Sequence, residues 1–485
     1  MNCQELIQIF LYNSKEQLLF HNGFFLFIFS FFILGYAFVF HNHRFRNIFI
    51  VLFSLYFYYK ASGEFVILLL FTITIDYLFS LLLSKQKSKP LKKIVLLIGV
   101  SFSLSFLSYF KFRNFFLENL AVLTHGNFSP MELILPIGIS FYTFQSISYL
   151  VDVYYEKIKL PNYSDYLMYM TFFPHLVAGP IVRAKDFIPQ LKNKLSINKE
   201  TINEAFYLIT KGLIKKAIIA DFVAQYSDIV FSAPDGFSGT EHIISTLCYT
   251  LQIFCDFSGY TDIAIGVALL LGFRLCLNFD SPYKAMNITS FWHKWHISLS
   301  SWLRDYIYIP LGGNRKGTYL QLLFLVITML IGGLWHGANW KFIFWGGAHG
   351  ILLILHKLSY KYIYFNNFGS WYKYFSWFFT FCCVSLLWIP FRALSIQDTW
   401  LIYTKIFTDS NIGIIKGLLE INSLLFILIF MGYALTMLPK TYKEIIKMKY
   451  YNLDFYMKII LLIVVIQVFI QMRFSTVQPF IYFQF

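Results

Sequence analysis

Long apolar runs separated by short basic or polar turns dominate both ends of the chain. Four such runs lie near the start, at 23–40, 48–59, 65–83 and 94–110, and three near the end, at 371–389, 424–438 and 457–471. A membrane-spanning helix needs about 20 predominantly apolar residues. With the more interrupted runs between these ends, the pattern predicts an all-α polytopic membrane protein with about nine to eleven transmembrane or membrane-buried helices.

The residue pattern changes near residue 131, where Pro, Gly, His, Asp and Arg begin to interrupt the apolar runs. Polar and helix-breaking groups persist at membrane depth only where they face protein or a water-filled cavity. We therefore expect three parts. Residues 1–125 form N-terminal transmembrane hairpins, 126–360 a functional core with re-entrant and interfacial helices, and 361–485 C-terminal transmembrane helices.

Composition and charge agree with a membrane protein. The 485 residues are 58% hydrophobic and only 13% charged, whereas soluble domains average about 45–50% and 25%. The net charge of +15 therefore indicates cytoplasmic loops and anionic lipid headgroups, and no nucleic acid is expected as a partner. By the positive-inside rule, the basic turns at 41–46 and 85–93 are predicted to face the cytoplasm.

Residues 201–220 resemble a basic interfacial helix on the cytoplasmic surface. The apolar face of this helix would carry Phe206, Ile209, Leu213 and Ala217, with Lys211, Lys215 and Lys216 off that face.

Two histidines lie in an amphipathic pattern at residues 287–306. As a helix, this segment has one face with Trp292, Trp295, Leu299, Trp302, Leu303 and Tyr306, and another with His293, His296, Ser300 and Arg304. Thr289 or Ser290 is expected to cap its start. The segment is either an interfacial helix with histidines at the headgroup level or a site of imidazole chemistry. Metal binding is not expected, because no carboxylate or cysteine nearby completes a ligand set.

A further histidine, His336, follows an apolar run and lies among glycines, in the sequence GGLWHGANW at 332–340. Glycine permits close backbone approach, and imidazole suits general base catalysis near neutral pH. The alternative is a hydrogen-bonded core histidine. His349 and His356, seven residues apart on one helical face, are expected to be structural.

Two more polar patches interrupt apolar sequence, at 172–183 around His175 and at 255–266 around Asp256 and Asp262. Ion coordination in a transporter is one interpretation. Bent, interior-facing segments that line a cavity are the favoured one, in which buried aspartates need donors.

Together these motifs carry a resemblance. The stretches WHKWHISLSSWLRDYIYIPLGGNR (292–315) and GLWHGANW (333–340) resemble the membrane-bound O-acyltransferase family, in the branch that contains the membrane subunit of alginate O-acetyltransferase and the peptidoglycan O-acetyltransferases. Supporting stretches, in the same order, are PIGISFYTFQSISYLVDVYY, FFPHLVAGPIVR, GLIKKAIIADFVA, DFSGYTDIAIG and WIPFRA. His175 and His293-Lys294 depart from the common family pattern, which indicates that the chemistry does not require His293.

The resemblance implies a ring of helices around a central tunnel, with His336 at the family's nearly invariant histidine and His296 at its second active-site position. Its candidate substrate-binding or tunnel-lining residues are Trp335, Asn339, Ser300, Arg304, Asp305, Asp256 and His175. The implied reaction moves an acetyl group from a cytoplasmic thioester, acetyl-CoA, to hydroxyls of an extracytoplasmic polysaccharide, either an alginate-like exopolysaccharide or peptidoglycan.

The same resemblance implies a bacterial-type inner (plasma) membrane location, no bound cofactor or metal, and a periplasmic or extracellular acetyltransferase- or esterase-like partner. Two alternatives remain. Teichoic-acid D-alanylation would take its acyl group from a carrier protein. A transporter or flippase would be marked by repeated halves, and the sequence has no internal repeat.

Overall fold

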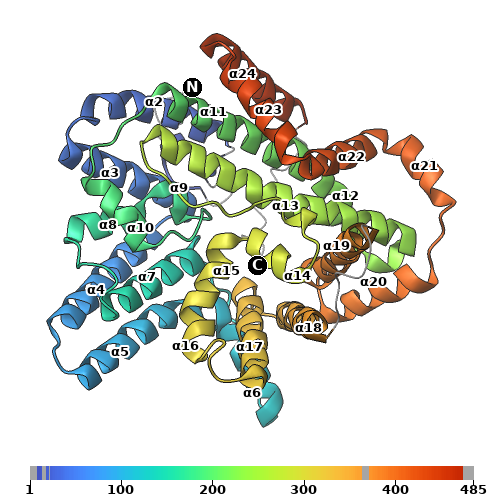
Figure 1. Ribbon diagram of the computed structural model, residues 1–485, viewed down its shortest axis with the longest axis horizontal. Helices are drawn as coiled ribbons and strands as arrows, with labels where there is room; N and C mark the ends of the chain where they lie inside the picture. Colours follow the sequence, from blue (N-terminus) through green and yellow to red (C-terminus); the bar gives the residue numbers. More distant parts are fainter. Residues whose placement is uncertain (1–7, 14–17, 21, 363–370, 473–485) are drawn as a thin grey trace. The chain divides into compact units, whose positions relative to one another are not determined.

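Every regular element in the described part of the chain is helical (Figure 1). The computed structural model describes residues 8–13, 18–20, 22–362 and 371–472. The described residues pack as two compact units, one of those within 1–205 together with Ala264–Cys276 and one of Phe206–Ile263 together with those within 277–485. Helices α11 (Lys199–Leu213) and α13 (Gly239–Leu270) contribute residues to both units. The three-part division by membrane placement and function stays a prediction.

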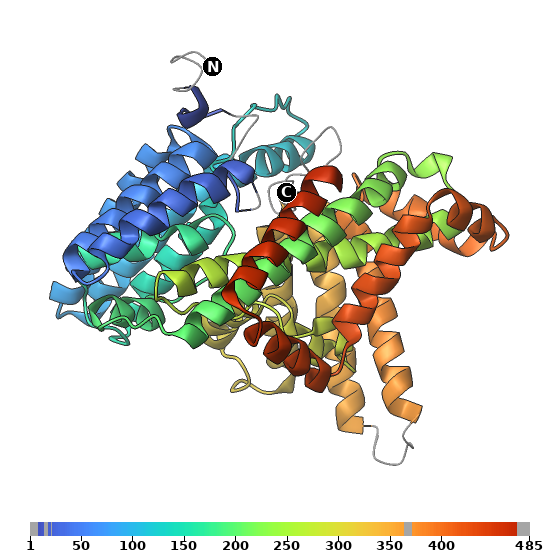
Figure 2. The same ribbon diagram turned by 90° about the horizontal axis from the view of Figure 1, so that it is seen from above.

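The first unit is a bundle of apolar helices in which α2 to α5 and α7 pack side by side (Figure 2). Its elements are α2 (Gly23–Val39), α3 (His43–Ser62), α4 (Phe65–Lys85), α5 (Lys89–Leu107), the π-helical turn η1 (Ser108–Phe112), α6 (Arg113–Thr124), α7 (Ile139–Tyr154), α8 (Tyr163–Thr171), α9 (Phe173–Leu176) and α10 (Ala184–Lys192). Phe173 lies in its core, with ring centroids 5.0 Å from Phe53 and 5.5 Å from Phe57. Aromatic rings therefore fill the space between these helices.

The second unit contains the histidine motifs. Its elements up to residue 311, besides α11 and α13, are η2 (Ile214–Ala220), α12 (Asp221–Ser232), η3 (Pro234–Gly236), η4 (Pro282–Lys284), α14 (Ile288–Lys294), α15 (Ile297–Leu303), η5 (Arg304–Tyr308) and α16 (Ile309–Leu311). Then follow α17 (Thr318–His336), α18 (Trp340–Tyr362), α19 (Trp371–Arg392), α20 (Ile396–Thr408), α21 (Ile414–Ile421), α22 (Ser423–Met437), α23 (Lys440–Tyr451) and α24 (Phe455–Met472). Helix α18 packs against both α17 and α19.

Six helices in the described residues are long and apolar enough to cross a membrane. They are Phe65–Lys85, Lys89–Thr124, Gly239–Leu270, Thr318–His336, Trp340–Tyr360 and Trp371–Arg392. Two helix pairs, α21 with α22 and α23 with α24, pass the same test together but bend by 95° and 114°, which raises the number to eight if each pair is one span. The protein is a multi-pass, all-helical membrane protein, as predicted.

Candidate functional site

The predicted continuous helix over 287–306 is wrong, because the helix breaks at His296. Helix α14 ends at Lys294, and His296 adopts the left-handed conformation with φ 41° and ψ 56° before α15 begins. The backbone of the loop residue Asn278 accepts from the Ile297 N–H at 2.9 Å, and its Oδ1 accepts from the Ser298 N–H at 3.3 Å. These bonds satisfy donors at the start of a new helix, and His296 is fully buried (0% exposed).

The start of the preceding helix also differs from the prediction. Asn287, rather than Thr289 or Ser290, caps α14, because its Oδ1 accepts from the Ser290 N–H at 2.8 Å. Asparagine is among the residues preferred at this position. The Thr289 hydroxyl instead lies 2.9 Å from Nδ1 of His356 in α18.

His336 is the last residue of α17 and is 4% exposed. Close packing of α17 against α18 fixes its position, since a Cβ added to Gly333 would lie 2.2 Å from the Phe342 carbonyl oxygen. On the other helix, a Cβ at Gly346 would lie 2.3 Å from the Met329 carbonyl oxygen. Only glycine permits this approach. The hairpin brings the His336 ring to 5.1 Å from the ring of Trp345 in α18.

Trp335 contacts both histidines. Its ring centroid lies 6.1 Å from that of His296 and 4.9 Å from that of His336. Phe257 of α13 lies edge-on to His296 at 4.6 Å, and Phe391 of α19 lies 5.1 Å from His336. We call these residues the histidine–aromatic cluster: Phe257, His296, Trp335, His336, Trp345 and Phe391. The structure thus brings together both predicted catalytic histidines and the predicted Trp335.

Sequence reasoning assigned no role to Phe257, Trp345 or Phe391. Phe257 and Phe391 lie within stretches that carry the family resemblance, at 256–266 and 388–393. The stretches were visible, but their contacts depend on how α13 and α19 pack, which periodicity does not show.

The environment of His296 sets its charge. Burial lowers the pKa of His296 from 6.5 to about 3, so the imidazole is neutral near pH 7. A neutral imidazole has one N–H donor and one nitrogen lone pair. Hydrogen bonds act strongly in a water-poor setting. The cluster therefore has the groups needed to accept a proton and to stabilise a developing negative charge.

A cavity of about 590 Å³ in the same unit includes Ser300 and Arg304 in its lining, together with His293, His356 and Lys357. The Ser300 hydroxyl donates to the Trp295 carbonyl at 3.1 Å. Arg304 Nε donates to Asp305 Oδ1 at 2.8 Å. Ser300 and Arg304 thus line a cavity, and Asp305 is bonded to Arg304. Their role as tunnel-lining residues stays a prediction.

Asp256 has the donor that its burial requires. Lys216 Nζ lies 2.7 Å from Asp256 Oδ1 and 2.7 Å from Asp221 Oδ1, and the Lys216 side chain is 1% exposed. Burial alone would lower the pKa of Lys216, but the two carboxylates hold it above its ordinary value. The predicted placement of Lys216 off the apolar face is wrong, because residue 216 follows Ile209 by two helical turns and its side chain is buried in the π-helical turn η2.

The last two candidate residues, Asn339 and His175, are not members of the histidine–aromatic cluster. Asn339 is exposed at the start of α18, where its Oδ1 accepts from the Lys341 N–H at 3.0 Å. His175 belongs to the first unit, and its Nε2 lies 2.7 Å from the Tyr169 carbonyl oxygen. Burial lowers the pKa of His175 to about 4, so the ring is a neutral donor there. Both side chains have a local structural partner.

Comparison with known proteins assigns this arrangement to a family. The profile of the membrane-bound O-acyltransferase family matches residues 51–394, which contain the whole histidine–aromatic cluster. The peptidoglycan O-acetyltransferase of Helicobacter pylori is 34% identical over 430 residues, covering 82% of this chain and 79% of the relative. A probable alginate O-acetylase of Pseudomonas putida is 38% identical over 398 residues, covering 81% and 80%.

A third relative has a different named activity. The teichoic acid D-alanyltransferase of Streptococcus thermophilus is 29% identical over 238 residues, covering 45% of this chain and 56% of the relative. All three names describe acyl transfer. With the family profile and two relatives that match most of their own lengths, the chain belongs to the membrane-bound O-acyltransferase family and is an O-acyltransferase.

Proposed function

We propose that the enzyme moves an acetyl group from a cytoplasmic thioester, acetyl-CoA, toward hydroxyls of an extracytoplasmic cell-envelope polysaccharide. The relatives that match four fifths of the chain are named for peptidoglycan and alginate, which favours these two acceptors. The observation that carries the proposal is the contact of His296 and His336 with the same ring, Trp335. Residues 126–360 would be the catalytic core in a bacterial inner membrane.

In the proposed reaction, a nitrogen of His336 takes the proton from the acceptor hydroxyl. The hydroxyl oxygen attacks the thioester carbonyl carbon, the C–S bond breaks, and the leaving thiolate receives the proton from the imidazolium. In a second version, a nitrogen of His336 first attacks the thioester carbonyl carbon and takes the acetyl group as the thiolate leaves. The acceptor hydroxyl then takes the acetyl group from His336, and the proton of that hydroxyl neutralises the released thiolate. Neutral His296 donates its N–H to the carbonyl oxygen as negative charge develops there.

The aromatic rings around both histidines support this chemistry by excluding water, which would otherwise hydrolyse the thioester. Ser300 and Arg304 would contact substrate from the cavity that they line. The roles proposed for Asp305, Asp256, Asn339 and His175 are to hold the segments around them. Where the acceptor hydroxyl belongs to an acetyltransferase- or esterase-like partner outside the membrane, that partner would complete transfer to the polymer.

The test is the amount of acetate that mild base releases from purified envelope polysaccharide. Cells carry the intact enzyme, His336→Gln, His296→Gln or the control His242→Gln. His242 is also a buried histidine of the second unit, with Nε2 3.0 Å from the Pro234 carbonyl oxygen, a bond that glutamine retains. Because general acid–base groups contribute about 10²–10⁴-fold, we expect loss of at least about 100-fold for His336→Gln and near-normal acetate for His242→Gln.

Full acetylation by His336→Gln at equal protein level, with ester-linked D-alanine also unchanged, would overturn the catalytic role. The same samples are assayed for ester-linked D-alanine, because one relative is a teichoic acid D-alanyltransferase. If D-alanine disappears in His336→Gln while acetate is unchanged, the acyl group is D-alanine and the acetyl assignment is wrong.

A further inference from the structure

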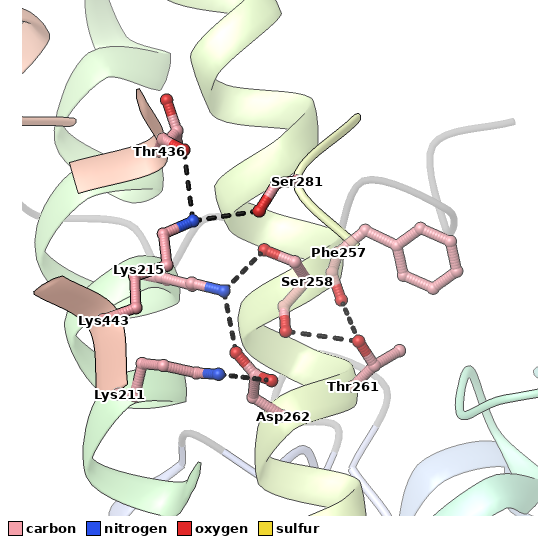
Figure 3. Close-up of polar contacts among 9 residues, drawn as sticks. All are labelled: Lys211, Lys215, Phe257, Ser258, Thr261, Asp262, Ser281, Thr436 and Lys443. Carbon is pink, nitrogen blue, oxygen red and sulfur yellow. Dashed lines mark hydrogen bonds and ion pairs between the residues drawn. The ribbon is translucent and has the colours of Figure 1, made fainter. Parts of the chain in front are cut away.

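Three lysine ammonium groups lie in a row along one side of α13 (Figure 3). Lys211 Nζ lies 3.1 Å from Asp262 Oδ1, and Lys215 Nζ lies 2.8 Å from Asp262 Oδ2 and 3.2 Å from Ser258 Oγ. Lys443 Nζ donates to Ser281 Oγ at 2.9 Å and to the Thr436 carbonyl at 3.2 Å. We call Lys211, Lys215 and Lys443 the lysine row.

Close helix packing places two of these lysines. A Cβ at Gly212 would lie 2.6 Å from the Gly259 carbonyl oxygen, and one at Gly259 would lie 2.8 Å from the Gly212 carbonyl oxygen. The two glycines therefore let α11 and η2 cross directly over α13. The crossing holds Lys215 beside Ser258 and Asp262, and the third lysine comes from α23, more than 200 residues later in the sequence.

The row carries more positive charge than its surroundings compensate. Asp262 pairs with Lys211 and Lys215, whereas Lys443 bonds only neutral oxygens among the described residues. Lys284 also lies close enough to repel the Lys443 ammonium, with Asp280 as the opposing carboxylate. The side chains of Lys211 and Lys215 are 33% and 22% exposed, so an added anion can reach them.

The helix that supplies Lys443 has the properties of an interfacial helix. Helix α23 exposes Tyr442, Ile445, Ile446 and Met448 and also carries four lysines: Lys440, Lys443, Lys447 and Lys449. It bends by 114° from the apolar helix that follows (Figure 2). A basic helix with exposed apolar residues, set at an angle to an apolar span, suits the headgroup level of a membrane.

We propose that the lysine row binds the phosphate of an anionic phospholipid headgroup. A phosphate diester supplies oxygens that accept charge-assisted hydrogen bonds from the three ammonium groups. The hydroxyls of Ser258 and Ser281 lie beside these ammonium groups as further donors. A lipid bound here would join α23 to η2 and α13 and so fix the bent pair against the rest of its unit. The proposal is independent of the acyl-transfer chemistry.

The test compares two lipids on the purified full-length protein in detergent. Binding of phosphatidylglycerol and phosphatidylcholine is measured by native mass spectrometry and by the shift in unfolding temperature. We expect phosphatidylglycerol to bind more tightly to the wild type. Each lysine near a headgroup contributes roughly fivefold in affinity, so Lys443→Gln should weaken phosphatidylglycerol about fivefold.

A second variant, Lys443→Gln with Lys215→Gln, removes two lysines while Asp262 keeps Lys211 as its partner, and should weaken binding at least about tenfold. The matched control is Lys440→Gln with Lys449→Gln, which removes two exposed lysines from the same helix and should retain the wild-type affinity. Equal weakening in this control would overturn the proposal, as would equal binding of both lipids to the wild type.

Soluble phosphates are tested in separate arms, with inorganic phosphate and with coenzyme A. If either raises the unfolding temperature of the wild type through the lysine row while phosphatidylglycerol does not, the site serves a soluble phosphate and the lipid assignment is wrong.

Discussion

At the scale of single residues, the conformation of His296 is the decisive feature. A non-glycine residue with positive φ costs about 1–3 kcal/mol and persists only where its surroundings impose it. Here φ is 41°, and the following two N–H groups are bonded to Asn278. Asn278 is buried in a loop 18 positions earlier in the chain. Its amide therefore positions the His296 imidazole without contacting substrate.

Replacing Asn278 tests its positioning role, because its effect on activity can be compared with that of Asn287, whose loss should cost similar stability. Asn278→Ala removes the acceptor for the Ser298 N–H and should lower the free energy of unfolding by about 0.5–2 kcal/mol, as loss of a helix cap does. Asn287→Ala, which uncaps α14, should cost a similar amount. We expect the rate of acetate transfer to fall at least about tenfold only in Asn278→Ala, because a small displacement of an active-site group costs that much or more. Equal rates in the two variants would contradict the positioning role.

Burial of His296 also predicts the direction of a pH effect on stability. The unfolded chain binds a proton at this residue below pH 6.5, whereas the folded protein keeps it neutral until about pH 3. The free energy of unfolding should therefore fall as the pH decreases from 6.5 toward 3, by about 1.4 kcal/mol per pH unit from this group.

His296→Gln should remove this residue's contribution to the pH dependence of stability. The unfolding temperature of the variant should therefore differ less between pH 7 and pH 5 than that of the wild type. The exposed His43, replaced by Gln, is the control. An unchanged difference in His296→Gln would mean that the ring is not held neutral.

At the scale of helices, the glycine contact between α17 and α18 sets the geometry of the cluster. Gly333 and Gly346 face each other across it, since a Cβ at Gly346 would lie 3.1 Å from the Gly333 Cα. Small residues at such contacts let helix backbones approach closely in membrane proteins. Since His336 ends one helix and Trp345 lies on the other, the separation of the two helices determines how the two rings meet.

Widening this contact should therefore impair the enzyme. Gly346→Ala places a methyl group against the Met329 backbone, and such overpacking costs about 1–3 kcal/mol. Gly417→Ala in α21, where nothing lies within 4 Å of the added Cβ, should stabilise by up to about 1 kcal/mol through helix propensity. We expect opposite shifts in unfolding temperature, with lost acetate transfer only in Gly346→Ala. A shift in the same direction for both would refute the steric account.

Sequence periodicity predicted the helices of uniformly apolar runs well. It failed where a residue distant in the sequence bonds to the helix backbone or side chains. The apolar runs at 65–83 and 371–389 correspond to α4 and α19. In 287–306, the 3.6-residue periodicity of apolar positions continues through His296. The helix nevertheless breaks there, where the N–H groups of Ile297 and Ser298 donate to Asn278, and His296 is buried. Lys216 also lies inward, where its side chain is buried and pairs with Asp221 and Asp256. The local pattern shows neither the loop that bonds to the residues after His296 nor the carboxylates that pair with Lys216.

At the scale of the whole molecule, the motifs identified both histidines and Trp335 but not the other aromatic rings of the cluster. His296 and His336 are 40 positions apart in the sequence, and Phe257 and Phe391 come from two further helices. Each lies in a recognisable stretch, so the residues were visible as motifs. The contacts of Phe257 with His296 and of Phe391 with His336 depend on how separate helices pack, which the local sequence does not show. The family resemblance, and not periodicity, singled out His296 and His336 as candidate catalytic residues.

The direction of acyl transfer depends on which side of the membrane each end of α4 faces. Lysines cluster between α4 and α5, and the tight turn before α4 contains Gly63 and Glu64. Because α4 is long enough to cross the membrane, these two turns lie on opposite sides, and the positive-inside rule predicts the lysine-rich turn in the cytoplasm. In a variant with the native cysteines replaced, Ser88→Cys should react with an impermeant maleimide only after spheroplasts are permeabilised, whereas Glu64→Cys should react in intact ones. The opposite labelling would reverse the predicted orientation and place the donor on the other side.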